Sequence, residues 1–156
     1  MTVPSHFDHR PLNQTSELGV AGERLAAEFL IAKGFRLVAA NFRVPVGRNS
    51  IGVQVTGEID LIGVDHETLC FIEVKTRRSE AFTPVITAVD LRKQRQITRI
   101  AKVYRKIFGI RGVDHRFDVV TVLLSEESNP QIEHHVGFWT EAQFRKRNWN
   151  DQVNED

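Results

Sequence analysis

Two strand-like segments separated by a short turn constrain the fold more than any other feature of this chain. Residues 58–64 and 68–76 are rich in β-branched and apolar residues, and the polar tripeptide 65–67 lies between them. This pattern predicts an antiparallel β-hairpin. Because side chains alternate between the two faces of a strand, Glu73 and Lys75 are expected to share one face.

The register of that hairpin adds a third charged residue to the same face. If the turn centres between His66 and Glu67, Asp60 lies directly opposite Glu73. Two opposed carboxylates repel each other unless a cation neutralises them, and Mg²⁺ prefers carboxylate, carbonyl and water oxygens. With the Lys75 ammonium beside them, the set favours metal-assisted hydrolysis of a phosphodiester. A solvated ion pair between Asp60 and Lys75 on an exposed sheet face is the alternative.

The elements around the hairpin predict an α/β domain. Their order, α-β-β-β-α-β, predicts a central mixed sheet flanked by helices. We expect helices over 16–33, capped by Ser16, and within 91–108, ended by Gly109; strands over 35–43, 58–64, 68–76 and 116–124; a polar loop over 76–84; an irregular loop or hairpin over 44–57; and a short edge strand over 134–138.

Length and composition fit a single domain. The chain has 156 residues, of which 41% are hydrophobic and 26% charged, as in ordinary globular proteins. We expect residues 1–15 to be a mobile lead-in, residues 16–140 to form the domain and residues 141–156 to be a polar tail. The lone cysteine, Cys70, excludes an intrachain disulfide and a Cys-rich zinc site.

Hydropathy excludes membrane-associated classes. No apolar run approaches the ~20 residues needed to cross a bilayer. The N-terminal residues lack the apolar core of a secretory signal. We therefore expect a cytoplasmic protein with no membrane partner.

Basic residues are concentrated in the second predicted helix. The net charge is only +1, yet residues 91–112 contain no acidic residue. Exposed helices usually interleave charges of both signs, so this segment favours binding to a phosphate backbone, with a merely solvated face as the alternative. Its basic residues are Arg92, Lys93, Arg95, Arg99, Lys102, Arg105, Lys106 and Arg111.

Glu23 is a further candidate because it borders the apolar stripe of the first predicted helix. Ala26, Ala27 and Leu30 follow it at helical spacing. An acid at a buried edge needs a partner, which a cation site on the sheet can supply; the alternative is that it reaches water. The six histidines show no metal-ligand spacing, and we assign them no role.

Seven segments, in matching order between about residues 18 and 138, resemble the YraN family of uncharacterised bacterial proteins (uncharacterised protein family 0102). That family is similar to the PD-(D/E)xK, restriction-endonuclease-like nucleases, and especially to the archaeal Holliday-junction resolvases. The segments are Gly22-Glu-Arg-Leu-Ala-Ala-Glu-Phe-Leu, Lys33-Gly-Phe-Arg-Leu, Asn41-Phe-Arg, Gly57-Glu-Ile-Asp-Leu-Ile, Phe71-Ile-Glu-Val-Lys-Thr-Arg, Ala88-Val-Asp-x-Arg-Lys and Arg116-Phe-Asp-Val-Val.

The resemblance implies a restriction-endonuclease-like α/β fold and a set of roles. Asp60 and Glu73 match the ligands of Mg²⁺ or Mn²⁺, which the Val74 carbonyl often joins. Glu23 matches a helix acid that helps to bind metal or water. Lys75 matches the lysine that positions the attacking water and stabilises the developing charge. By analogy with the resolvases, a homodimer is expected.

Together these features predict a metal-dependent nuclease acting on DNA, possibly at branched or junction structures. Arg92, Lys93, Arg95 and Arg99 are expected to bind backbone phosphates without reading sequence. Two alternatives stay open: a non-catalytic nucleic-acid-binding or accessory protein that kept the nuclease scaffold, and a module that docks another protein.

The chain departs from the family pattern in two places. Between Arg43 and Gly57 it carries roughly ten residues more than expected, long for a hairpin connection. They form either an arm that reaches over substrate or a tolerated insertion. Ile59 replaces the proline that often precedes the first aspartate in the superfamily.

Overall fold

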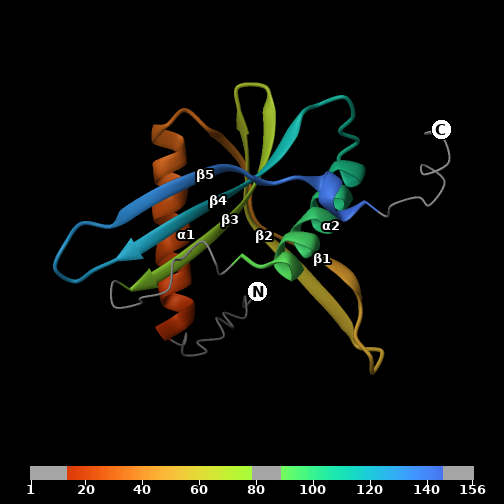
Figure 1. Ribbon diagram of the computed structural model, residues 1–156, viewed down its shortest axis with the longest axis horizontal. Helices are drawn as coiled ribbons and strands as arrows, with labels where there is room; N and C mark the ends of the chain where they lie inside the picture. Colours follow the sequence, from red (N-terminus) through yellow and green to blue (C-terminus); the bar gives the residue numbers. More distant parts are fainter. Residues whose placement is uncertain (1–13, 79–88, 146–156) are drawn as a thin grey trace, which may run out of the picture.

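The computed structural model describes residues 14–78 and 89–145 (Figure 1). The expected lead-in up to residue 13, the end of the expected polar loop over 79–84 and the tail beyond residue 145 lie outside these ranges. The elements are α1 (Gln14–Ala32), β1 (Arg36–Arg48), β2 (Gln54–Asp65), β3 (Thr68–Arg78), α2 (Leu91–Ile107), β4 (His115–Leu124), β5 (Gln131–Trp139) and the 3-10 helix η2 (Glu141–Phe144).

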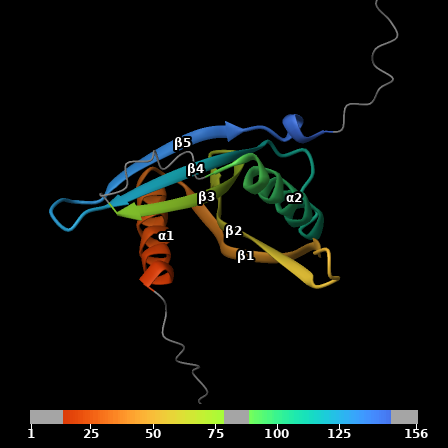
Figure 2. The ribbon, with the colours of Figure 1, turned by 60° about the horizontal axis from the view of Figure 1, so that its bottom comes forward.

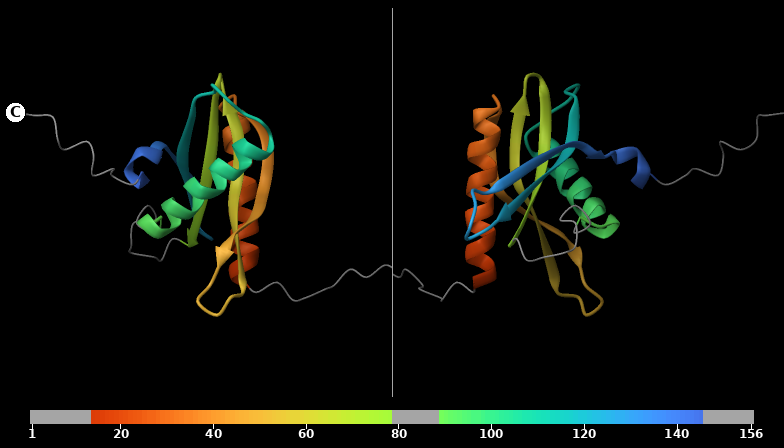
Figure 3. Two further views of the ribbon diagram at one scale, coloured as in Figure 1. Left: turned by 90° about the vertical axis from the view of Figure 1, so that its right-hand side faces the viewer. Right: turned by 60° about the vertical axis from the view of Figure 1, so that its left-hand side comes forward.

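Five strands form one mixed sheet in the order β1-β2-β3-β4-β5. β3 pairs with β4 in parallel, and the other neighbours are antiparallel. The two helices cover opposite faces of the sheet (Figure 3). This α/β architecture is consistent with the expected restriction-endonuclease-like fold. β5, expected only as a short edge strand, is a full strand that extends the order to α-β-β-β-α-β-β.

Strand alternation divides the core into two clusters. Phe71 belongs to the cluster beneath α2, where its ring stacks on Phe117, which stacks in turn on Trp139. Its neighbour Ile72 belongs to the cluster beneath α1, together with Leu30 of that helix. β3 is therefore apolar on both faces along much of its length, as expected of a strand between two helix layers.

The β2–β3 hairpin has the predicted register. Leu61 lies opposite Ile72, and Asp65 opposite Thr68, across a turn in which His66 has a φ of 55°. The ladder ends at the pair Leu61–Ile72. Asp60 and Glu73 therefore occupy the next position, just beyond the last paired residues.

Of the two alternatives expected for the segment 44–57, a loop or a hairpin, the structure has the hairpin, and it is a regular extension of β1 and β2 rather than an irregular one (Figure 2). β1 and β2 remain paired as far as Arg48 and Gln54, and the connection is confined to residues 49–53. A register shift between Pro45 and Gly47 accommodates the proline within the ladder.

Two further details differ from expectation. α1 begins at Gln14, so Ser16 lies inside the helix rather than at its cap. β3 continues to Arg78, through residues expected to be loop.

The boundaries of α2 follow local chemistry. The Asp90 side chain caps the N-terminus by accepting a hydrogen bond from the Lys93 amide at 2.9 Å. Gly109, with a φ of 61°, ends the helix where predicted, and the Ile110 amide closes the last turn on the Arg105 carbonyl. None of the described helices is long and apolar enough to cross a membrane.

Candidate metal and nucleic-acid site

Asp60 forms a side-chain contact where the β2–β3 ladder ends. Its Oδ2 accepts a hydrogen bond from the Val74 backbone amide at 2.7 Å. This bond joins the two strands just beyond their last paired residues, since Asp60 precedes Leu61 by one residue and Val74 follows Ile72 by two. The Asp60 carboxylate is thereby held against the segment of β3 that carries the other predicted site residues.

Glu73 is the most buried of the candidate carboxylates, with 2% of its surface exposed. Its Oε1 lies 3.1 Å from Lys75 Nζ and 3.6 Å from Lys93 Nζ. No described residue forms a hydrogen bond with its Oε2, which is also buried. A buried carboxylate oxygen without a partner is costly, so Glu73 has capacity for a further ligand.

The pKa of Asp60 reflects its burial beside the other acids. Burial, and after it the neighbouring Glu73 carboxylate, raise the pKa of Asp60 to about 8. The Val74 amide opposes this increase, Glu23 adds to it, and the Lys93 ammonium lowers it. A cation bound beside Asp60 would favour its ionised form in the same way as Lys93 does.

Glu23 reaches this region because α1 approaches β3 very closely. The approach takes place at Gly22, where an added Cβ would overlap the Thr76 side chain. Glycine is therefore required here by contact rather than by backbone conformation. It places the next residue of the helix, Glu23, beside the end of the β2–β3 ladder.

An asparagine links Glu23 to a further acid. The Asn41 Nδ2 atom donates to Glu23 Oε2 at 3.0 Å and to Glu58 Oε1 at 2.7 Å. Asn41 has a φ of 50°, in the left-handed region that asparagine tolerates better than most residues. Glu58 is also bound by Arg43, whose Nε lies 2.6 Å from Oε2. The Asn41 side-chain amide therefore holds Glu23 of α1 and Glu58 of β2 in a fixed position relative to each other.

The four basic residues predicted to bind nucleic acid do not act as one group. Lys93 turns towards Glu73, as described above. Arg95 lies over the Phe144 ring at 5.5 Å, and Arg99 donates to the Val46 carbonyl at 3.1 Å. Arg92 is exposed. Three of the four thus remain on or near the outer face of α2, and one belongs to the acidic cluster.

The site offers a cation two carboxylates rather than a closed cage. Within residues 14–78 and 89–145, no three His, Cys, Asp or Glu side chains stand together as a ready-made metal cluster. Mg²⁺ typically keeps several waters and binds through one or two carboxylates plus substrate phosphates. Asp60 and Glu73, with the unpartnered Glu73 oxygen, fit that mode of binding.

Sequence reasoning missed Asn41 and Glu58 and assigned Lys93 a different environment. The one sequence feature that pointed to Asn41 is its place in a segment that carries the family resemblance, Asn41-Phe-Arg. Lys93 reaches Glu73 because α2 crosses the sheet, which strand alternation cannot predict.

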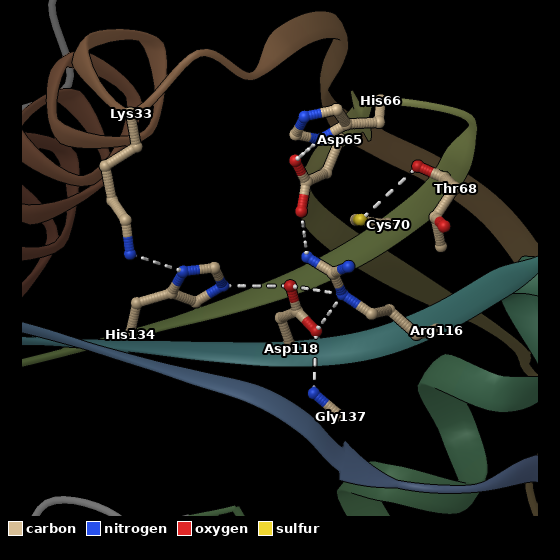
Figure 4. A network of polar contacts seen from close by, with 9 residues as sticks. All are labelled: Lys33, Asp65, His66, Thr68, Cys70, Arg116, Asp118, His134 and Gly137. Atoms are coloured by element: carbon tan, nitrogen blue, oxygen red, sulfur yellow. Dashed lines mark hydrogen bonds and ion pairs between the residues drawn. The ribbon is translucent and has the colours of Figure 1, made fainter.

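A second polar network lies at the other end of β3 (Figure 4). Its centre is Asp118, which is fully buried and accepts hydrogen bonds from Arg116, His134 and the Gly137 amide. Burial opposes ionisation of Asp118, but these donors outweigh it and hold the pKa of the carboxyl below its usual value. Arg116 also binds Asp65, which ties the β2–β3 turn to β4.

The same network fixes the tautomer of His134. Its Nδ1 lies 3.3 Å from Lys33 Nζ, and an ammonium can only donate. Nδ1 therefore accepts, and Nε2 carries the proton that is donated to Asp118 at 2.8 Å. Through this chain of contacts the end of α1 is joined to β5 and β4.

Comparison with known families and proteins gives a consistent result. The model of "Uncharacterised protein family UPF0102" matches residues 22–122. A "UPF0102 protein" of Chlorobium limicola is 38% identical over 142 residues, covering 87% of this chain and 99% of that protein. A "UPF0102 protein" of Desulfosudis oleivorans is 42% identical over 111 residues, covering 71% and 82%.

A further relative and one solved structure complete the comparison. "UPF0102 protein STH1475" of Symbiobacterium thermophilum is 43% identical over 105 residues, covering 67% of this chain and 80% of that protein. A solved structure described as "Crystal structure of SSO0001" has a TM-score of 0.39 and 16% identity, and the match covers 83% of this chain and 56% of that one.

Proposed function

We propose that this chain, which belongs to the UPF0102 family, is a metal-dependent nuclease that hydrolyses DNA phosphodiester bonds, at branched or junction structures. One observation carries the proposal. A buried carboxylate, Glu73, retains an unpartnered oxygen beside Asp60, with two lysine ammonium groups on its other oxygen. We further expect the protein to act in the cytoplasm.

This cluster suits an ion such as Mg²⁺ or Mn²⁺, which binds through one or two carboxylates and keeps several waters, better than an ion that needs all its ligands from the protein. Asp60 and Glu73 would hold the ion, the Val74 carbonyl would join them, and Glu23 would assist through a bound water. The ion supplies positive charge that offsets the carboxylates and withdraws electrons from the phosphoryl group. The Asn41 amide keeps Glu23 oriented while it does so.

Lys75 is the residue best suited to handle the attacking water. Its Nζ lies 3.1 Å from Glu73 Oε1, so the ammonium can donate to a water held at that carboxylate. The same charge stabilises the negative charge that develops on the phosphoryl oxygens. Lys93, 3.6 Å from the same oxygen, adds a second positive charge that can face the scissile phosphate.

The outer face of α2 is suited to bind the flanking phosphates. Arg92, Arg95 and Arg99 lie on exposed positions of this helix, which begins beside the carboxylate cluster. Contacts of this kind position a backbone without reading its sequence. We therefore expect binding that depends steeply on salt concentration.

The test is cleavage of single-stranded, duplex, flapped and four-way-junction DNA with Mg²⁺ or Mn²⁺. Wild-type protein should cleave, whereas Asp60→Ala and Lys75→Ala should lose at least a hundredfold in rate. Glu67→Gln and Arg36→Ala are matched controls, because each removes one exposed charge away from the cluster. Cleavage that survives Asp60→Ala unchanged would reject this mechanism.

The same experiment distinguishes a nuclease from the main alternative, a non-catalytic accessory protein. A non-catalytic accessory protein would bind these DNAs in a salt-sensitive manner and cleave none of them. Binding in that case should be lost on Arg92→Ala with Arg99→Ala, and should not change on Asp60→Ala. Binding of Mn²⁺ that depends on Glu73 would count against such a protein.

A further inference from the structure

The β1–β2 hairpin continues beyond the body of the molecule as an arm, residues 44–57 (Figures 1 and 2). Its base is packed against α2. Val44 is buried, Gly57 leaves room for Ile100, whose Cδ1 would lie 2.7 Å from an added Cβ, and Arg99 donates to the Val46 carbonyl. The arm is therefore fixed beside the basic face of α2.

The tip of the arm is built rather than loose. The Asn49 side chain accepts hydrogen bonds from the amides of Ile51 and Val53, and its backbone amide donates to the Val53 carbonyl at 2.9 Å. Arg48 donates to the Gly52 carbonyl at 2.7 Å. Residues 49–53 are thus held in one conformation by hydrogen bonds within the tip itself.

This ordered tip presents apolar side chains to solvent. Ile51 is 80% exposed and Val53 is 55% exposed, and Val55 below them is 37% exposed. A cluster of exposed apolar side chains on a fixed support indicates a binding surface. The partner must offer an apolar surface to this tip.

The charge of the arm indicates which partner that is. Within the arm the sequence has one arginine, Arg48, and no acidic residue. The adjoining α2 face is basic as well. The partner therefore has negative charge on its surface, to face the basic residues, and apolar groups behind that surface, to receive the tip. A nucleic acid has both, in its phosphate backbone and its stacked bases.

Geometry connects the arm to the candidate site. The arm enters β2 at Gln54, on the same strand as Asp60, so its tip lies roughly 20–30 Å along the strand from the carboxylates. That span corresponds to about six to nine base pairs of a duplex. A nucleic acid that lies across the carboxylates and α2 would reach the tip.

We propose that the arm is a wedge that inserts Ile51 between bases where a duplex is interrupted. Opening an intact stack costs a few kcal/mol per step, whereas at a junction or flap the stack is already broken. The wedge therefore selects branched over continuous duplex DNA. This inference rests on the proposed function and assigns recognition of its branched substrate to the arm.

The experiment compares binding and cleavage of a four-way junction with those of a continuous duplex of the same sequence. Ile51→Ser should weaken junction binding about tenfold, by losing the burial of one large apolar side chain, and leave duplex binding unchanged. Val136→Ser is the matched control, since Val136 is 58% exposed on β5 and should leave both affinities as in wild type. Fluorescence of 2-aminopurine at the branch point reports unstacking directly, and the increase seen with wild type should be absent with Ile51→Ser.

Binding is measured with Ca²⁺ in place of Mg²⁺, so the test does not depend on cleavage. Junction preference that falls with Ile51→Ser supports the wedge even if no DNA is cut, in which case only the nuclease proposal fails. Cleavage with an unchanged preference in Ile51→Ser overturns the wedge and leaves the nuclease standing. A change of sedimentation coefficient in Ile51→Ser, or loss of binding to anionic vesicles with no change on DNA, would also overturn it in favour of self-association or a lipid surface.

Discussion

The carboxylate of Asp60 and the backbone amide of Val74 form a 2.7 Å hydrogen bond just beyond the end of the β2–β3 ladder. Elsewhere in the sheet a main-chain carbonyl accepts the hydrogen bond between two strands; here the Asp60 carboxylate is the acceptor. One consequence is that the Asp60 carboxylate is fixed through its Oδ2 atom. Substitutions at Asp60 will therefore affect both the local sheet and any ligand, so tests of the site need a second residue.

Glu73 provides that second residue for a test of metal binding. At a free Mn²⁺ concentration 100 times its Kd, binding to the folded state adds about 2.7 kcal/mol, or roughly 5–10 °C in Tm. We expect this shift in wild type and not in Glu73→Gln, measured by thermal unfolding with and without Mn²⁺. Glu67→Gln, an exposed turn residue, should keep the shift. An equal shift in all three proteins would exclude Glu73 as a ligand.

Gly22→Ala should destabilise the protein by about 1–3 kcal/mol, because the new methyl group overlaps the Thr76 side chain. Urea unfolding measures the change. Gly19→Ala is the control in the same helix: nothing lies within 4 Å of its Cβ position, so stability should rise by up to about 1 kcal/mol. Thr76→Ala should partly rescue Gly22→Ala, and a fully additive double mutant would contradict the contact.

Substitutions at Asn41 can distinguish the contribution of its side-chain amide from that of its left-handed backbone conformation. Asn41→Ala should lose about 1–2 kcal/mol more stability than Asn41→Gly, because alanine is strained at a φ of 50°. Both variants lose the link between Glu23 and Glu58, so both should bind Mn²⁺ about tenfold more weakly by calorimetry. Wild-type Mn²⁺ affinity in Asn41→Gly would show that the amide does not position these acids.

Asp118 makes stability depend on acid pH. Its folded pKa lies below the usual 3.8, so its stabilising effect is complete above about pH 4 and is lost as pH falls through the folded value. Asp118→Asn should cost about 3–5 kcal/mol at pH 7, since it removes one partner of a buried ion pair. The difference between variant and wild type should shrink below pH 4.

The control for this pH dependence is Asp114→Asn, just before β4. It should change stability little at pH 7 and should follow the wild-type curve as pH falls. A constant difference between Asp118→Asn and wild type from pH 7 to pH 2.5 would show that the charge of Asp118 contributes nothing. Denaturant unfolding at each pH provides the free energies.

The hairpin at the centre of the candidate site was predictable because its information is local. A two-residue turn, His66 and Glu67, between two alternating segments fixes the register, and the register fixes which residues face each other. Leu61 and Ile72 pair accordingly. The same reasoning put Glu73 and Lys75 on one face, where they form an ion pair.

Features that depend on distant parts of the chain were not predictable. Lys93 approaches Glu73 because α2 crosses the sheet, and helical periodicity says nothing about where a helix crosses. The regularity of the arm was missed for a related reason: glycine and proline weaken a strand by itself, but pairing with Gln54–Gly57 stabilises it.

The sheet consists of two locally connected groups, β1-β2-β3 and β4-β5, which meet along the parallel β3–β4 ladder. Hairpin contacts form early in folding, whereas this ladder must wait until residues far apart in sequence meet. The carboxylates all belong to the first group together with α1, and Lys93 follows it in the chain. A chain that has folded only its first group would thus pair Glu73 with Lys75 but lack the second ammonium, Lys93, so the electrical balance of the site is completed only when α2 packs against the sheet.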